Sequence, residues 1–214
     1  MRNIILDAKI KKELRKFQEF KKQYNFVPKE IEERKGALFC DGVCIRENED
    51  AELLGESETF VNVGYKLHGA LPKILSNLFP YKFYFKGQTL SSAESFFQGI
   101  KFKDIKAQKQ VFLLSGLDSN NIKAAQDYHW KDTGTVYFLG KPYNRFEQDY
   151  ENLVDEMYVS LLQNPLFTNA LKAAGNKYIL HAMGEPNPKE TVFSRLEFEK
   201  QLNTLKDYCL RNKQ

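Results

Sequence analysis

Apolar residues recur at helical spacing along much of the chain, and this periodicity constrains the fold more than any other feature. Spacings of three and four residues predict helices at about 8–24, 91–103, 106–114, 122–127, 146–163, 165–174 and 194–211. Residues 116–121 are expected to form a loop. The pattern predicts an α+β fold that is mostly helical, with a small β-sheet.

The strand-forming regions are short. Residues 36–46 place Asp41-Gly42 between two apolar runs, which predicts a hairpin. Over residues 81–86, aromatic side chains alternate with lysine and tyrosine before a Lys-Gly-Gln turn. This alternation predicts strands that border a loop.

The first predicted helix is basic and amphipathic. Ile10, Leu14, Phe17 and Tyr24 share one stripe, with lysine and arginine around it. We favour a helix that covers a core and turns its charged face to water. Docking on nucleic acid or anionic lipid is the alternative, which the pattern leaves open.

Charge and hydropathy narrow the class of protein. Lys and Arg number 32 against 28 Asp and Glu, a net charge of +4, which suits an anionic substrate or nucleic acid without indicating a polybasic binder. No apolar run approaches the roughly 18 residues of a membrane span. The first residues also lack the apolar core of a secretory signal, so we expect a cytoplasmic protein without a membrane partner.

The cysteines and histidines predict no metal site. Cys40, Cys44 and Cys209 form an odd set, which argues against a secreted disulfide framework. Cys40 and Cys44 flank the hairpin turn, so we expect them to face each other as small apolar residues. A metal pair is the alternative, but the three histidines complete no zinc-ligand spacing.

The segment 91–102, SSAESFFQGIKF, carries the strongest indication of chemistry. Ser91 and Glu94 have the spacing of a capping box, which predicts the helix start. At about 100° per residue, Glu94, Gln98 and Lys101 fall within roughly 60° of arc, beside an apolar face. This places an acid, an amide and an amine where they can line a pocket. The alternative is that Glu94 only caps the helix while Gln98 and Lys101 are solvated.

Residues 75–102, LSNLFPYKFYFKGQTLSSAESFFQGIKF, resemble the signature of the NADAR family, named for NAD and ADP-ribose and also called YbiA-like. The family pattern has Ser-Asn followed by a proline, a strand and turn, and a helix that runs into Phe-Gln-x-x-Lys-Phe. The resemblance covers roughly residues 60–205, and its ending has a His181-x-x-Gly184 element before Thr191-Val192 and a final helix. The matching residues are Ser76, Asn77, Pro80, Glu94, Phe97, Gln98, Lys101 and Phe102.

The sequence departs from the family pattern at several positions. Leu78 stands at a usual aromatic residue, Ala93 at a usual serine, and Ser95 at a frequent histidine. The Asp-x-x-Trp-Gly ending of another family branch is missing, which leaves the choice of substrate open. The resemblance implies a YbiA-like fold, with residues 58–214 as the NADAR-like catalytic domain and residues 1–57 as a helix and hairpin extension.

The resemblance implies an N-glycosidase. Members of the family act on phosphorylated riboflavin-pathway intermediates or remove ADP-ribose from guanine in DNA. Both reactions break a C1–N bond of ribose through an oxocarbenium-like state, which requires a carboxylate near C1 and donors for the phosphates. Glu94 suits the role of the carboxylate near C1, where it would act as a proton shuttle. We favour Lys101 as the nucleophile that forms a Schiff base with the opened sugar, and phosphate binding is its alternative role.

Six further residues are expected at the substrate. Asn77 would bind a ribose hydroxyl, Gln98 would hold Glu94 or the sugar, and His181 with Gly184 would form a loop near the pocket. Trp130, together with the aromatic residues 81–85, would stack on a base, or would belong to the core. Phe97 matches the family motif beside Gln98 and completes this set.

Three functions remain open at this point. The first is a hydrolase that removes ADP-ribose from guanine in DNA or cleaves a related nucleotide, with riboflavin-pathway intermediates as alternative substrates. The second is a non-catalytic module that binds ADP-ribose or NAD. The third is an interaction protein whose N-terminal helix docks on nucleic acid or a partner. We expect an ADP-ribose-type ligand, with ADP-ribosylated nucleic acid as a further partner, and no cofactor; the sequence does not define the oligomeric state.

Overall fold

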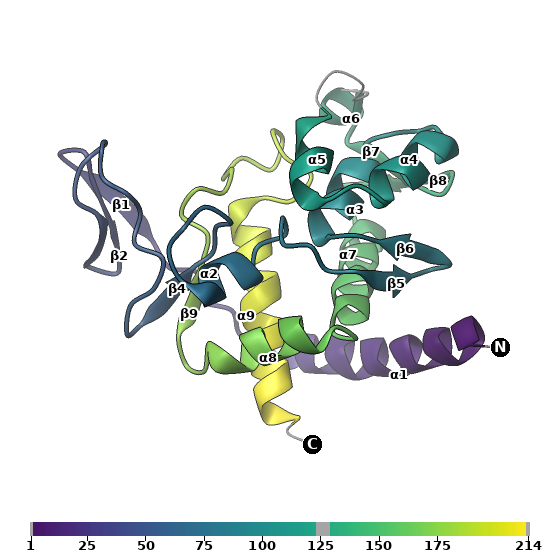
Figure 1. Cartoon of the computed structure of the whole chain (residues 1–214), viewed down its shortest axis with the longest axis horizontal. Coiled ribbons are helices and arrows are strands. Elements are labelled where there is room, and N and C mark those ends of the chain that lie inside the picture. The colour runs from purple at the N-terminus through teal and green to yellow at the C-terminus, as the bar shows by residue number, and fades with distance from the viewer. Residues whose placement is uncertain (1, 123–128, 213–214) are drawn as a thin grey trace.

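The computed structural model describes residues 2–122 and 129–212 (Figure 1). In these ranges the helices are α1 (Arg2–Gln23), α2 (Ala70–Ile74), α3 (Ala93–Gly99), α4 (Ile105–Phe112), α5 (Gly116–Asn121), α6 (His129–Thr133), α7 (Gln148–Leu161), α8 (Pro165–Ala173) and α9 (Arg195–Arg211). The strands are β1 (Ile31–Arg34), β2 (Ala37–Cys40), β3 (Val43–Arg46), β4 (Phe60–Asn62), β5 (Phe83–Phe85), β6 (Gln88–Leu90), β7 (Thr135–Phe138), β8 (Lys141–Asn144) and β9 (Tyr178–Leu180).

The fold is α+β, as the sequence predicts, but its strands form several small sheets instead of one. Strands β1, β2 and β3 make an antiparallel sheet, while β5 pairs with β6 and β7 pairs with β8 in antiparallel hairpins. Strand β4 pairs with β9 in parallel, which joins segments more than a hundred residues apart. The Lys86-Gly87 turn has positive φ at both residues, as a two-residue hairpin of this twist requires.

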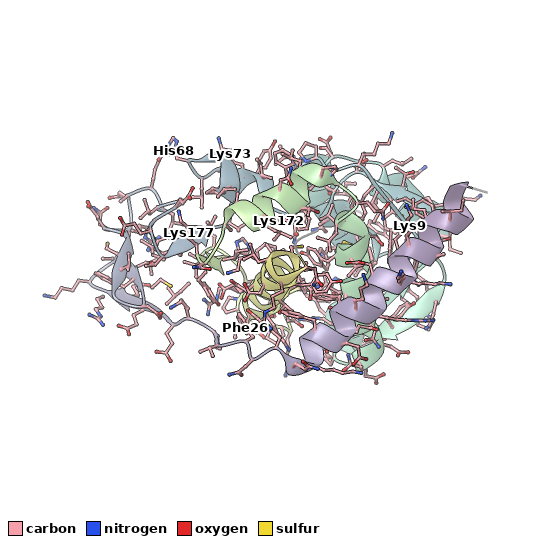
Figure 2. The ribbon with its side chains drawn as sticks, turned by 90° about the horizontal axis from the view of Figure 1, so that it is seen from below. Lys9, Phe26, His68, Lys73, Lys172 and Lys177 are labelled. Carbon is pink, nitrogen blue, oxygen red and sulfur yellow. The ribbon has the colours of Figure 1, made fainter. Side chains whose placement is uncertain are left out.

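The long helices enclose one main core. Helix α9 runs through the middle of the molecule, with α7, α8 and α1 around it (Figure 1). Tyr158 and Leu202, from α7 and α9, are fully buried there with Phe96 from α3. Viewed from below, α9 is seen almost end-on between α8 and α1 (Figure 2).

Helix α1 packs on this core through the stripe that the sequence predicts. Ile10 and Phe17 are buried, and Leu14 packs against the same cluster. Tyr24 follows the end of the helix, and its hydroxyl donates to Asp207 at 2.9 Å. The apolar face of α1 is therefore used within the fold. The division of the chain after residue 57 stays a prediction.

The expectation for the two cysteines of the hairpin is wrong. Because the turn consists of Asp41 and Gly42, Cys40 lies opposite Val43, and Cys44 lies opposite Phe39. The two cysteines are therefore one pair out of register. Cys40 is buried in a small second core, whereas Cys44 is half-buried, and both are free thiols.

Two further predictions need comment. Residues 116–121 form helix α5 instead of a loop, because Ser115 caps it by accepting a hydrogen bond from the Asp118 amide at 3.1 Å. The helix expected at 122–127 falls, beyond Ile122, outside the described residues. Within the described part of the chain, no helix is both long and apolar enough to cross a membrane.

Candidate active site

Helix α3 begins one residue later than the sequence suggests. Its N-cap is Ser92, whose hydroxyl accepts from the Ser95 amide at 2.9 Å, while the Ser92 amide donates to Ser95 Oγ at 3.3 Å. The predicted capping box of Ser91 and Glu94 is therefore wrong. Because Ser92 and Ser95 form the capping box, the Glu94 carboxylate is not used in capping.

The helix also ends earlier than expected, at Gly99. Lys101 lies in the turn that follows, where its amide donates to the Gln98 carbonyl at 3.3 Å. This tight turn keeps the Lys101 side chain on the same side of the helix as Gln98. The facing predicted from helical spacing is thus preserved beyond the helix end.

A chain of hydrogen bonds joins the acid to the amine. Gln98 Nε2 donates to Glu94 Oε1 at 2.6 Å, and Lys101 Nζ donates to Gln98 Oε1 at 2.9 Å. All three side chains line one cavity of about 190 Å³. The amide of Gln98 has one donor and one acceptor directed at its two neighbours, so it fixes the positions of both charged groups.

Burial changes the protonation of both charged groups. It raises the pKa of Glu94, although the hydrogen bond from Gln98 and the charge of Lys101 act against this rise. Burial also lowers the pKa of Lys101 to about 8, against the attraction of Glu94, and the nearby charge of Lys131 lowers it further. With that pKa, about a tenth of the Lys101 amines are neutral at pH 7. Neutral amine is the form that can act as a nucleophile.

Asn77 reaches the same cavity from the segment after α2. The Tyr158 hydroxyl donates to Asn77 Oδ1 at 2.7 Å, and the Glu94 amide donates to the Asn77 carbonyl at 2.9 Å. Asn77 is thus fixed by helix α7 on one side and by helix α3 on the other. Its Nδ2 group has no protein acceptor among the described residues, so it is available to a ligand.

His181 lies in the cavity wall just after β9. Its Nδ1 is 2.9 Å from the Val63 carbonyl oxygen, which can only accept, so Nδ1 carries the hydrogen. Burial lowers the pKa of His181, with a further decrease from the charge of Arg195. The ring is therefore neutral at pH 7, with Nε2 as an acceptor.

Position 184 requires glycine because there is no room for a side chain, and not because of its backbone conformation. Its amide donates to the His181 carbonyl at 2.9 Å, which forms the expected turn. A Cβ on Gly184 would lie 2.6 Å from His181 Cδ2 and 3.0 Å from Arg195 Cβ. Any larger residue would push on the histidine ring.

Trp130 and the aromatic residues 81–85 do not form the expected stacking surface. Tyr81, Phe83 and Phe85 are buried in the main core, because the alternating side chains of this strand point inward. Trp130 is also buried and does not line the cavity. Its ring centroid lies 5.6 Å from Lys101 Nζ, so the structure places it against the lysine.

Phe97 packs against Phe193, a residue of the cavity wall that the sequence analysis missed. Its ring is buried and stacks on Phe193, with centroids 4.7 Å apart and planes at 14°. Phe193 lines the cavity beside Thr191 and Val192. Residues 191–193 follow no helical or strand period, so only the resemblance to the family indicated that this part of the chain lies near the site.

Arg145, also missed by the sequence analysis, holds the segment that carries these wall residues. Its guanidinium is buried and donates to the carbonyls of Pro188 at 2.9 Å and Thr191 at 2.7 Å. It also donates twice to the Glu197 carboxylate, at 3.0 and 2.8 Å. The Tyr150 hydroxyl donates to the Val192 carbonyl nearby. These contacts tie residues 188–192 to helices α7 and α9.

A second cavity of about 320 Å³ adjoins the first. The two share Asn77, Glu94 and His181 in their walls, so Glu94 borders both cavities. Ser76 and Asn120 add polar groups to the second cavity. Among the residues that the structure describes, no group of three or more His, Cys, Asp or Glu side chains has the arrangement of a metal site.

Known proteins resemble this chain over most of its length after residue 70. The family described as bacteriophage protein GP30.3 matches residues 70–207. The "Uncharacterized 17.1 kDa protein in Gp30-rIII intergenic region" of Enterobacteria phage T4 is 32% identical over 136 residues, covering 62% of this chain and 88% of the relative. The NMR structure of the E. coli protein YbiA is similar with a TM-score of 0.47 and 13% identity, over 74% of this chain and 89% of that one.

The match over residues 70–207 defines the class of protein. The chain belongs to the bacteriophage GP30.3 family, which is a family of the NADAR type. The resemblance inferred from the sequence is thereby confirmed at the level of the family. The likeness to YbiA is too distant to support an argument about activity.

Proposed function

We propose that the protein is an N-glycosidase that cleaves the bond between a base and a phosphorylated ribose, with ADP-ribose attached to guanine in DNA as its substrate. The observation that carries this proposal is the hydrogen-bonded chain of Glu94, Gln98 and Lys101 in one cavity. A carboxyl group with a raised pKa beside an amine with a lowered pKa suits acid and nucleophile roles.

The proposed reaction proceeds through a Schiff base. Ring opening gives C1 of the ribose an imine bond to the amine of the base, and the neutral Lys101 amine adds to C1. The C1–N bond to the base then breaks, and the base amine leaves with the proton of Glu94. Water adds to the Schiff base that remains, Glu94 takes the proton of that water, and the Lys101 amine is released with free sugar.

The other cavity residues would bind the sugar. Asn77 Nδ2 is free to donate to a ribose hydroxyl, while His181 Nε2 can accept from one. Phe193 provides an apolar wall, backed by Phe97. In this arrangement Gln98 orients Glu94 and Lys101, and Trp130 lies against the lysine amine, whose burial favours its neutral form.

Turnover by single variants tests the proposal. The substrates are an oligonucleotide with ADP-ribosylated guanine and, separately, phosphorylated riboflavin-pathway intermediates. We expect Lys101→Ala and Glu94→Gln each to lower turnover by at least a hundredfold, while Lys103→Ala, an exposed lysine two residues away, leaves it unchanged. Unchanged turnover in the first two variants would refute the roles assigned here. Tight ADP-ribose binding without product in the natural protein would instead indicate a binding module.

A further inference from the structure

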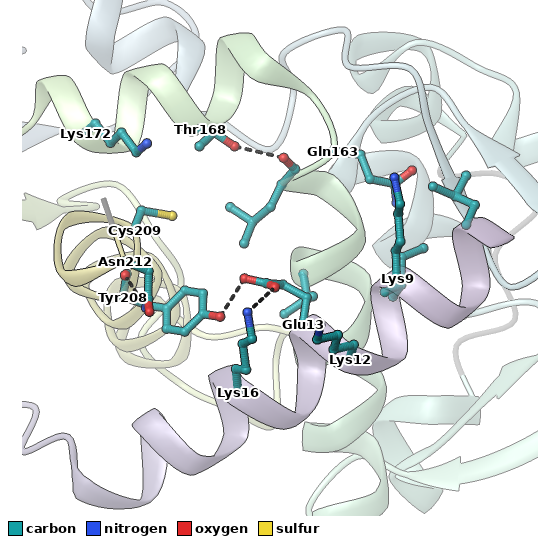
Figure 3. A pocket seen from close by; sticks show the side chains of 14 residues that line it. Lys9, Lys12, Glu13, Lys16, Gln163, Thr168, Lys172, Tyr208, Cys209 and Asn212 are labelled. Carbon is teal, nitrogen blue, oxygen red and sulfur yellow. Dashed lines mark hydrogen bonds and ion pairs between the residues drawn. The ribbon is translucent and has the colours of Figure 1, made fainter. Parts of the chain in front are cut away.

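A second cavity lies apart from the candidate active site and shares no lining residue with it. Helices α1, α7, α8 and α9 enclose a cavity of about 420 Å³ (Figure 3). Tyr158 on α7 bonds to Asn77 in the candidate active site, while its neighbour Val159 and Leu162, just after the helix, line this other cavity. Its α1 side lies outside residues 70–207, the part of the chain that the family match covers.

The rim of the cavity is positively charged. Lys9, Lys12 and Lys16 on α1 stand on one side, and Lys172 on α8 lies across the opening from them (Figures 2 and 3). Among the described residues, Lys9, Lys12 and Lys172 have no ion-pair partner. The cavity therefore presents unneutralised amines at its mouth, which attract an anion.

The one acidic residue in the lining does not cancel this charge. Glu13 accepts a hydrogen bond from the Tyr208 hydroxyl and lies 3.5 Å from Lys16 Nζ. Its carboxylate is thus engaged within the protein. The hydrogen bond and the charge of Glu13 reinforce burial in raising the pKa of Tyr208, so the phenol remains neutral.

The interior of the cavity is apolar. Its walls include Leu6, Ile10, Val159, Leu162 and Cys209. Burial raises the pKa of the Cys209 thiol to about 11, so it remains protonated and behaves as an apolar group.

Three neutral polar side chains of the walls each donate a hydrogen bond to a carbonyl of the protein. Thr168 Oγ1 donates to the Leu162 carbonyl, Asn212 Nδ2 donates to the Tyr208 carbonyl, and Gln163 Nε2 donates to the Tyr84 carbonyl. A sugar or a base edge would need several converging polar groups, whereas Leu6, Ile10, Val159, Leu162 and Cys209 make much of this wall apolar. The walls therefore suit an alkyl chain better than a nucleoside.

We propose that this cavity binds a free anionic amphiphile, a fatty-acid-type molecule with its alkyl chain between α1, α7 and α9 and its carboxylate at Lys9 and Lys172. Its volume lies within the roughly 300–1,000 Å³ of small-molecule sites. Ile10, Leu14 and Phe17 of α1 pack against the core, so this stripe is not free to enter a membrane. The inference does not depend on the proposed function.

Calorimetric titration of the full chain with decanoate, below its micelle concentration, tests the proposal. We expect saturable one-to-one binding, with octanoate about tenfold weaker because two fewer methylenes are buried. Decyltrimethylammonium, with the same chain and the opposite charge, is expected not to bind. Absence of saturable decanoate binding, or equal binding of the cation, would overturn the proposal.

Charge reversals locate the site. Lys9→Glu and Lys172→Glu are each expected to weaken decanoate binding at least tenfold, with unchanged circular dichroism. Lys11→Glu, an exposed residue of α1 outside the lining, serves as the matched control and is expected to change binding by less than twofold. Equal weakening by Lys11→Glu would contradict the site, as would inorganic phosphate binding as tightly as decanoate. Cosedimentation with phosphatidylglycerol vesicles without binding of free decanoate would indicate a lipid surface instead, and would also refute the proposal.

Discussion

Substitution of Arg145 tests whether this residue stabilises the fold, shapes the candidate active site, or does both. Its buried guanidinium makes four hydrogen-bond contacts: two to Glu197 and two from the single Nε–H, which is shared between the carbonyls of Pro188 and Thr191. Replacement by alanine removes all four and leaves the Thr191 carbonyl, next to the cavity wall, without its donor. We therefore expect Arg145→Ala to destabilise the fold and to loosen the segment that carries Phe193.

The loss of stability in Arg145→Ala follows from the hydrogen-bond partners that the arginine leaves behind. Loss of a buried ion pair costs about 3–5 kcal/mol, but the Glu197 side chain is 39% exposed and keeps its bonds from Ser194, so water offsets part of the loss. Each carbonyl deprived of its donor adds about 1 kcal/mol or more, although Pro188 is exposed and can bind water. The net loss is about 3 kcal/mol, which for a chain of this size lowers the melting temperature by about 6–12 °C.

Urea denaturation and steady-state kinetics measure the two effects separately. At a temperature where the variant remains folded, we expect kcat/KM of Arg145→Ala to fall at least tenfold, because Thr191, Val192 and Phe193 line the cavity. Arg145→Lys keeps the charge but not the fork geometry, and should restore less than half of the loss. Arg15→Ala, on the exposed face of α1, is the control. Lost stability with full kcat/KM would show that this arginine serves the fold alone.

Three further predictions concern the cavity itself. The unfolding free energy of the natural protein should rise by about 1–2 kcal/mol between pH 8 and 10. The reason is that the Lys101 pKa is higher in the unfolded chain, which therefore binds more protons than the folded protein in that window. Lys101→Met should lack this rise when denaturation is measured as a function of pH. Gly184→Ala should cost about 1–3 kcal/mol in denaturant unfolding and weaken ligand binding, since the new Cβ meets His181; unchanged values would contradict this packing. Tyr158→Phe should cost about 1 kcal/mol and raise KM more than it lowers kcat, because Asn77 loses the donor that orients it.

The local part of the site could be predicted from the sequence. Glu94, Gln98 and Lys101 lie within one short segment, so helical geometry alone places them on one side. The exact helix start could not be predicted, because Ser91 and Ser92 both precede residues that can complete a capping box. In the structure the box is formed by Ser92 and Ser95, and Ser95 Oγ also donates to the carbonyl of Phe112 at the end of α4.

The distant part of the site could not be derived from periodicity. Asn77 and His181 come to Glu94 only through long-range packing, and the resemblance to a family was the sole indication of both. Tyr158 belongs to a segment whose apolar pattern predicts only a helix and its core face, and Arg145 lies in the turn before that helix. Their polar functions depend on partners that lie between 43 and 81 residues away in the sequence.

Buried aromatic residues were the least predictable. Tyr81, Phe83 and Phe85 show the alternation of a strand, which does not reveal whether the side chains face a ligand or the core. The same holds for Trp130, whose position against Lys101 depends on the packing of α6 near α3. Burial decides between these alternatives, and burial is a property of the assembled fold.

Reductive trapping tests the central claim most directly. The protein is incubated with an ADP-ribosylated guanine oligonucleotide and sodium borohydride, and intact-protein and peptide mass spectrometry follow. If Lys101 forms a Schiff base with C1, a stable sugar adduct will appear on the peptide that contains Lys101, and Lys101→Ala will abolish it. Turnover of the substrate without any adduct, or an adduct that persists in Lys101→Ala, would contradict the account.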